Sequence, residues 1–412
     1  MAQIPNHNIH KSSEVSTKLV EASALGDHVN ALRSQNKLSI VELEAKANAL
    51  INELARDQKD VYEVDGSSLR LHGVLKAMLD NANIFDGEDS LKYAAEAICD
   101  CSRTEGGVDH TLQELRDLAR TWLSHFLYPF KSSHSHVTQK NKSPAEVTTP
   151  TLDKTRSILG GDLIPIDRPK SQTQLILERD GHQCSVSGKM ADTHPLIIKE
   201  TPGIRASELH CAHVLRCAVA VIGNRDTEEF HTSSSECFDI LKNYCGLSED
   251  RLKDLNAFID HPINSFMLRE TLYTTFDKFR WTLIPTEGDN RYKLKNLDPI
   301  RSELEDLLGG RTVEDVVVEF KDHRRESAQL RGEKTLPPAI PLPDPLFFKI
   351  HAAVGGILKM SGAGKFFDEL LAKYDHDKDP MGAPSFDDVV RSLGATEFGE
   401  EFRKSPHIRS FL

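Results

Sequence analysis

Apolar side chains recur every three or four residues through much of residues 15–130, a spacing that places them on one face of an α-helix. The clearest run spans residues 38–55, and a second spans residues 112–127. In the first run we expect the buried face to consist of Leu43, Ala47, Leu50, Ile51 and Leu54. We therefore predict that residues 1–130 form a helical region, whose helices pack on one another or on a protein partner.

Residues 131–160 break this pattern. They are rich in Ser, Thr, Lys, His and Pro and contain few large apolar side chains. A segment of this composition cannot bury enough apolar surface to fold by itself. We expect a linker here, which joins the helical region to a domain of different character.

Residues 161–300 contain short apolar runs separated by turn signals, which are typical of strands. We expect one strand over residues 182–189 and a second over residues 209–215. The period of two in the second strand places His213 on the same face as Leu209 and Cys211. A turn is expected to lead into a helix over residues 262–277, with Asn264 at its start. A β-hairpin is expected over residues 279–294.

Helical periodicity returns over residues 301–412. A proline-rich break at residues 336–345 divides this region, and we expect two helices after it, over residues 346–364 and 365–374. The whole pattern predicts an α+β protein, in which a small central domain is flanked by N- and C-terminal helical regions.

Composition narrows the function classes. The chain has 412 residues and a net charge of −12, which argues against a surface that wraps nucleic acid everywhere but leaves room for a local basic groove. It contains no run long enough to span a membrane and no visible secretory signal, and its seven cysteines follow no disulfide pattern. The Cys and His residues also lack the paired spacing of structural zinc sites. We expect an intracellular protein without structural zinc, with nucleus and cytoplasm both open.

The central domain also carries residues suited to metal-assisted phosphodiester cleavage. A strand histidine such as His213 can take a proton from water near neutral pH. The amide of Asn264 can hold that imidazole in place or present a hard oxygen to Mg²⁺, and a further side chain on the following helix can complete the shell of the cation.

These segments resemble the fungal branch of HNH endonuclease domains. The resemblance rests on Cys184-Ser-Val-Ser-Gly, on Leu209-His-Cys-Ala-His-Val-Leu, and on the run from Asn264 to Phe276-Asp277. It covers residues 172–297 and part of the C-terminal helical tail. It implies a central ββα-metal domain with an extra β-hairpin, a divalent cation (Mg²⁺ or Mn²⁺), and nucleic acid as substrate, DNA rather than RNA.

Carried over by position, the resemblance implies that His213 is the general base and that Asn264 orients the site or binds the cation. Asp277 matches the Phe-Asp pair and is a candidate ligand. The last His of the family, a metal ligand, falls on Tyr273, and a phenol is a poor ligand for Mg²⁺. Three functions stay open: an HNH-type endonuclease, a non-catalytic HNH-like module that binds nucleic acid or another partner, and a purely helical scaffold function through residues 15–130.

Each of these residues also has an explanation without catalysis. His213 fits a histidine in a buried strand, Asn264 a helix N-cap, Tyr273 a helix packing position and Asp277 the start of a turn. Only their joint pattern indicates a nuclease-like site.

Overall fold

The computed structural model describes residues 38–64, 66–103, 106–131, 172–191, 207–215, 237–253, 255, 258, 261–298, 301–330, 332–335 and 337–376. The chain divides into two compact units. Unit 1 takes its residues from 1–136, 216–255 and 356–412, and unit 2 takes its residues from 137–215 and 256–355. Nearly all of the linker predicted over residues 131–160 lies outside the described residues.

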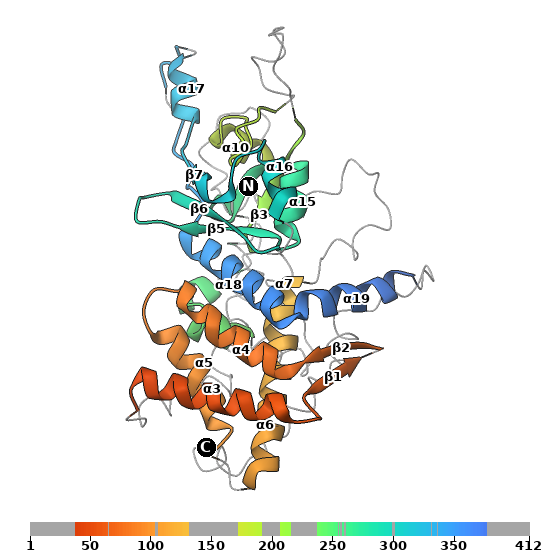
Figure 1. The fold of residues 1–412 in the computed structure, drawn as a ribbon. Coiled ribbons are helices and arrows are strands. Elements are labelled where there is room, and N and C mark those ends of the chain that lie inside the picture. The colour runs from red at the N-terminus through yellow and green to blue at the C-terminus, as the bar shows by residue number, and fades with distance from the viewer. Residues whose placement is uncertain are drawn as a thin grey trace, which may run out of the picture. The chain divides into compact units, whose positions relative to one another are not determined.

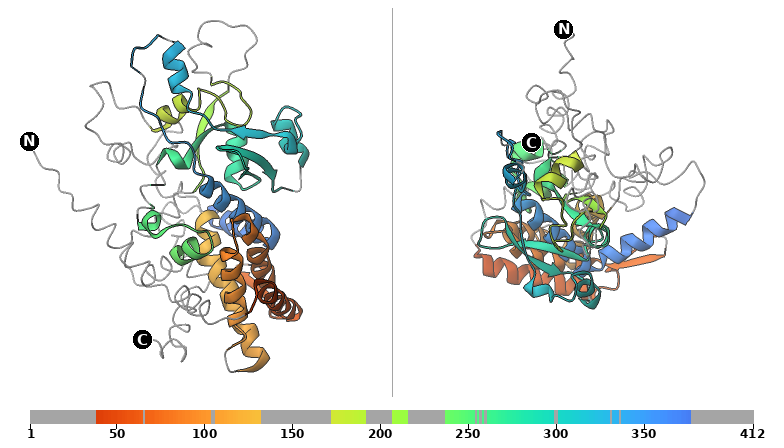
Figure 2. Two further views of the ribbon diagram at one scale, coloured as in Figure 1. Left: turned by 90° about the vertical axis from the view of Figure 1, so that its left-hand side faces the viewer. Right: turned by 90° about the horizontal axis from the view of Figure 1, so that it is seen from above.

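Unit 1 is built on four helices that pack on one another: α3 (Ile40–Arg56), α4 (Leu71–Asn81), α5 (Asp89–Asp100) and α6 (Gly107–Thr121) (Figures 1 and 2). The helix α6 continues through a π-helical turn, η2 (Trp122–Leu127), into α7 (Tyr128–Lys131). The helix α3 begins at a capping box, in which Ser39 and Glu42 each bind the other's backbone N–H. Its buried residues are the five predicted from the sequence, so that prediction is confirmed.

A β-hairpin interrupts the helices of unit 1, where we had expected helix throughout. Its strands are β1 (Val61–Val64) and β2 (Ser67–Arg70), joined through Gly66, which has a φ of 75°. Exposed and buried residues alternate along both strands. The four-residue strands are too short for their period of two to stand out against the longer helical runs around them.

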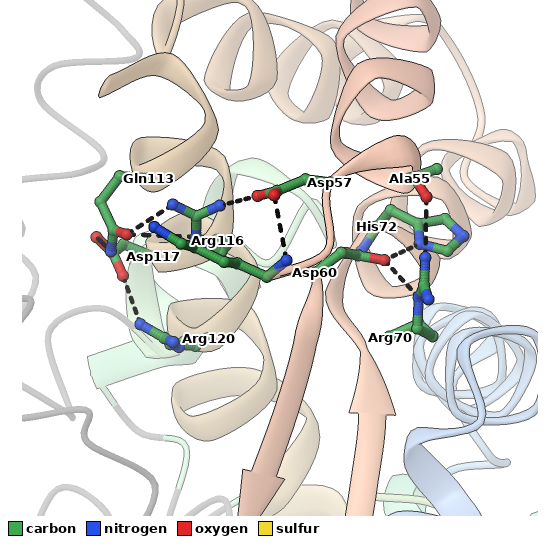
Figure 3. A network of polar contacts seen from close by, with 10 residues as sticks. Ala55, Asp57, Asp60, Arg70, His72, Gln113, Arg116, Asp117 and Arg120 are labelled. Atoms are coloured by element: carbon green, nitrogen blue, oxygen red, sulfur yellow. Dashed lines mark hydrogen bonds and ion pairs between the residues drawn. The ribbon is translucent and has the colours of Figure 1, made fainter. Parts of the chain in front are cut away.

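Buried polar contacts tie this hairpin to its neighbouring helices (Figure 3). Asp60 is 0% exposed and accepts hydrogen bonds from Arg70 Nε at 2.7 Å and from the backbone N–H of His72 at 2.8 Å. The Nδ1 atom of His72 also lies 2.5 Å from Asp60. Asp57, directly after α3, forms an ion pair with Arg116 of α6. These contacts fix the hairpin and both helices in one arrangement.

The remaining described parts of unit 1 are a helix that includes residues 237–243, α13 (Glu249–Lys253), the last turn of α18 (Pro345–Ser361), and α19 (Ala363–His376). The hydroxyl of Tyr244 donates to the carbonyl of Met78 at 2.7 Å, and Tyr93 donates to Asp239 at 2.8 Å. Residues 237–255, which lie inside the central region predicted from the sequence, therefore contact the N-terminal helices instead.

Unit 2 contains an antiparallel pair, β3 (Leu209–His213) and β4 (Ser265–Arg269), followed directly by α15 (Glu270–Asp277). The helix predicted to begin at Asn264 therefore begins at Glu270, after a short 3-10 turn, η5 (Pro262–Asn264), and a strand. Both α15 and α10 (Gln172–Arg179) pack against the pair. Consecutive residues of β4 are buried as a result, which removes the alternation that marks a strand in a sequence.

The strand predicted over residues 182–189 is also absent. Gln183 and Met190 form one isolated bridge around a turn, and the N–H of Gly188 donates to the carbonyl of Cys184 at 2.8 Å. The antiparallel pair that leads into α15 therefore consists of β3 and β4, rather than of residues 182–189 and 209–215.

A three-stranded antiparallel sheet completes unit 2, in the order β5 (Trp281–Pro285), β6 (Arg291–Asn296) and β7 (Val317–Glu319). The predicted hairpin over residues 279–294 is confirmed, whereas β7 lies in a region predicted to be helical. The strand β7 is preceded in the chain by α16 (Arg301–Leu307) and η6 (Val313–Asp315) and is followed by α17 (Arg324–Leu330). The aromatic core of the unit consists of Phe266, Phe276, Trp281, Tyr292, Phe320 and Phe348.

The predicted α+β class is confirmed by this mixture of helices and small antiparallel sheets. The helices expected after the proline-rich break are present as α18 and α19, which are separated at Gly362 with a φ of 79°. Within the described ranges, no helix has both the length and the apolar character needed to cross a membrane.

Candidate functional site

The pairing of β3 with β4 brings two of the predicted site residues to the same end of this antiparallel pair. His213 is the last residue of β3 and lies opposite Ser265. Asn264 directly precedes β4, and its carbonyl accepts a hydrogen bond from the N–H of Val214 at 2.8 Å. The Asn side chain therefore lies beside the chain segment that leaves β3 immediately after His213.

Both polar atoms of the Asn264 side chain bind the backbone of Leu215. Its Oδ1 accepts from the N–H of Leu215 at 2.7 Å, and its Nδ2 donates to the carbonyl of Leu215 at 2.9 Å. The residue is 0% exposed. This arrangement fits a residue that orients the end of β3, and it does not fit the cation ligand that we predicted as the other role of Asn264.

A buried Arg–Asp pair at the end of α10 holds the chain on both sides of Asn264. Arg179 donates to the carbonyls of Pro262 at 2.8 Å and Ser265 at 2.6 Å, and to Asp180 at 2.7 Å. Asp180 in turn accepts from the N–H of Met267 at 2.8 Å. Neither residue was among the sequence candidates, because nothing in an Arg-Asp dipeptide after a short helix shows that distant carbonyls will converge on it.

His213 is half-buried, and its Nε2 atom is buried without a hydrogen-bond partner among the described residues. Burial lowers its pKa to about 4, while the negative charge of Asp277 acts in the opposite direction. The imidazole is therefore neutral at pH 7. It can accept a proton, although a pKa this low makes it a weak base.

The predicted ligands Tyr273 and Asp277 share one face of α15 with Glu270, because the three residues are three and four positions apart. The ring of Tyr273 stacks on the ring of His210, with 5.3 Å between the ring centres and an angle of 19° between the planes. The position at which the HNH pattern has a metal-binding His is thus occupied by an aromatic ring packed on another ring.

Within the part of the chain that the structure describes, one group of three His, Cys, Asp or Glu side chains brings its ligand atoms together: Glu208, His210 and Glu270. The predicted ligands Asn264, Tyr273 and Asp277 do not belong to it. The sequence candidates did not include Glu208 or Glu270. A Glu-x-His spacing at the start of a strand was the available signal, since it places both side chains on one face.

A row of basic side chains lies on the exposed face of β6. Arg291, Lys293 and Lys295 are exposed and alternate with the buried Tyr292 and Leu294. None of the three basic residues forms an ion pair with any described residue. Glu319, which lies opposite Arg291 on β7, pairs with Lys321 at 3.1 Å. The basic row therefore keeps its charge available to an anionic partner.

No protein-family model, curated protein or solved structure matches the chain.

Proposed function

We propose that unit 2 contains an HNH-like ββα module that binds nucleic acid through its phosphates and does not cleave it. The observation that carries this proposal is the state of the two residues on which cation binding would depend. Both polar atoms of the Asn264 amide bind the backbone of Leu215, and Tyr273 stacks on His210.

Cleavage of a phosphodiester by such a module requires a divalent cation that stabilises the charge on the phosphate and on the leaving oxygen. Of the three predicted ligands, Asp277 alone offers a carboxylate, while Asn264 is engaged elsewhere and a phenol such as that of Tyr273 binds Mg²⁺ poorly. The predicted site therefore does not fit Mg²⁺ or Mn²⁺ well enough to support catalysis.

Binding to phosphates is supported by the basic row on β6. Alternate residues of a strand are separated by about 6.7 Å, so three positive charges extend over roughly 13 Å of exposed strand. A chain with a net charge of −12 would repel a polyanion elsewhere on its surface. A local row of cations without carboxylate partners is the feature that can contact a backbone of phosphates, at the cost of strong salt dependence.

The test is the binding of fluorescently labelled single-stranded and double-stranded DNA and RNA oligonucleotides to the full chain, measured by anisotropy at several salt concentrations. The double variant Lys293→Glu, Lys295→Glu should weaken binding at least about tenfold and reduce the salt dependence by about two phosphate contacts. The matched control is Lys46→Glu, Lys59→Glu, which changes two exposed lysines of unit 1 by the same charge. Equal losses in both double variants, or no binding by the wild type at low salt, would contradict the proposal.

One observation favours the second candidate function, a metal-dependent endonuclease with His213 as general base. His213 lies at the end of β3 with a neutral imidazole and a ring nitrogen that binds none of the described residues. Plasmid nicking with Mg²⁺ or Mn²⁺ separates the two functions. We expect no nicking; nicking by the wild type that is lost in His213→Ala would establish the endonuclease instead. Equal nicking by both proteins would exclude His213 as the base.

A further inference from the structure

We propose that Glu208, His210 and Glu270 form a binding site for a divalent cation of the Zn²⁺ or Mn²⁺ type. One ligand atom of each residue lies within 4.8 Å of the ligand atoms of the other two. Glu208 and Glu270 are exposed and His210 is half-buried, so the group lies at the surface of unit 2, where a cation can reach it.

The register of the β3–β4 pair builds this group. Leu209 lies opposite Arg269, and continuing the same antiparallel register by one residue places Glu208 opposite Glu270. His210 is two residues after Glu208 and therefore lies on the same face of the strand. Since α15 begins at Glu270, its first turn starts directly beside both side chains.

The imidazole of His210 is held in place before any cation binds. Its ring stacks on Tyr273, which fixes the plane of the ring. Its Nε2 is buried and has no hydrogen-bond partner in the described ranges. A ring with a fixed orientation is a better ligand than a mobile surface histidine, because less conformational freedom is lost when it binds.

Neither Glu208 nor Glu270 forms an ion pair with another residue that the structure describes. The neighbouring Arg269 donates to the carbonyl of Leu307. Two like charges this close repel each other unless a cation lies between them. The helix dipole accounts for a Glu in the first turn of α15, but it does not explain why Glu208 and His210 converge on that Glu.

The ligand set indicates the class of cation. One imidazole and two carboxylates suit Zn²⁺ or Mn²⁺, whereas Mg²⁺ prefers oxygen ligands and keeps most of its water. The site is independent of the proposed phosphate binding and of His213. Glu270 and Asp277 are seven residues apart, which corresponds to about 10 Å along the axis of α15. A cation here would link the start of β3 to the start of α15.

The experiment uses the full chain after removal of metal with a chelator. Zn²⁺ is titrated in competition with a chromophoric chelator, and Mn²⁺ is titrated separately. The variants are Glu270→Gln and His210→Gln, each of which removes one ligand, and the matched control is Glu287→Gln, an exposed glutamate in the turn between β5 and β6. Glu208→Gln is a third ligand variant, which repeats the comparison if either of the others fails to fold.

We expect the wild type and Glu287→Gln to bind one equivalent of Zn²⁺, and each ligand variant to bind it about 100-fold more weakly. Mutating a residue that only supports a metal ligand already lowers metal affinity about 10- to 100-fold. Addition of Zn²⁺ should also raise the unfolding temperature of the wild type and of Glu287→Gln, and not that of the ligand variants. If the wild type, the control and the ligand variants all bind the same number of equivalents with the same affinity, the proposal is overturned, whether or not the chain binds nucleic acid.

Discussion

Replacing Arg179 by Met should strongly destabilise unit 2. The guanidinium is 0% exposed and donates to the carbonyls of Pro262, Pro341 and Ser265 and to the carboxylate of Asp180, over distances of 2.6–2.9 Å. Methionine preserves much of the side-chain length, but it provides no donor. The carboxylate of Asp180 would then be buried without its main counter-charge.

The free energy of unfolding should fall by about 4 kcal/mol, because removing one partner of a buried ion pair costs about 3–5 kcal/mol of stability. With a typical urea dependence of about 2 kcal/mol per M, the unfolding midpoint should fall by about 2 M. Arg179→Lys keeps the charge but loses the planar fork and some of the four hydrogen bonds. We expect it to cost about half as much.

Unit 2 can be followed by itself because the chain has two tryptophans, and Trp281 is the one in unit 2. In a Trp122→Phe background, the fluorescence of Trp281 during urea unfolding reports on this unit. The control is Arg291→Met, which removes an exposed arginine of β6 and should change stability by about 0.5 kcal/mol or less.

Hydrogen exchange gives a second measurement. Arg179 holds the chain on both sides of Asn264, so Arg179→Met should also speed exchange of the N–H of Leu215, which donates to Asn264. An unchanged urea midpoint in Arg179→Met, or an equal shift in Arg291→Met, would refute the view that this buried pair holds the site.

Three further predictions follow from other contacts. Asn264→Asp keeps the acceptor for the N–H of Leu215 but places an oxygen against the Leu215 carbonyl. It should therefore lower the free energy of unfolding of unit 2 by about 2 kcal/mol in the same urea assay, and a loss of about 0.5 kcal/mol or less would contradict this. The free energy of unfolding of unit 2 should fall by about 3 kcal/mol as the pH falls from 6.5 to 4. The reason is that His213 has a pKa of about 4 in the folded chain and takes up a proton near pH 6.5 when unfolded. The His213→Gln variant should flatten that part of the stability profile, and a profile identical to the wild type would show that other groups cause it. Asp60→Asn should lower the free energy of unfolding of unit 1 by about 3 kcal/mol, because Asp60 is a fully buried carboxylate bound by Arg70 and His72. The loss is measured from Trp122 fluorescence in a Trp281→Phe background. The control is Asp86→Asn, at an exposed position, which should leave this free energy unchanged.

The sequence predicted best the long elements whose burial is one-sided. The helix α3 buries one stripe, so its period of three and four residues identified all five of its buried positions. The strand β4 was mistaken for the start of a helix because elements pack on both of its faces and its apolar run shows no alternation. Pattern reasoning fails at such a strand, since burial of both faces depends on segments far away in the chain.

The candidate site shows the same limit. The sequence singled out His213 and Asn264, and the structure places them at one end of the β3–β4 pair. It could not show that the Asn264 amide is engaged by Leu215, or that the carboxylates of Glu208 and Glu270 lie close together. Both facts depend on strand register, which is set by tertiary contacts rather than by the residues themselves.

Two adjacent glycines in α18, Gly355 and Gly356, allow each of the two units to be destabilised separately by a single substitution. A methyl group on Gly355 would lie 2.6 Å from Leu297, a residue of unit 2, whereas one on Gly356 would collide with Asn81, a residue of unit 1. Alanine favours helix over glycine by about 1 kcal/mol, so any damage from these substitutions must come from crowding. Neighbouring codons could thus yield two temperature-sensitive alleles, one that impairs each half, and comparing their phenotypes would show which half a cell depends on.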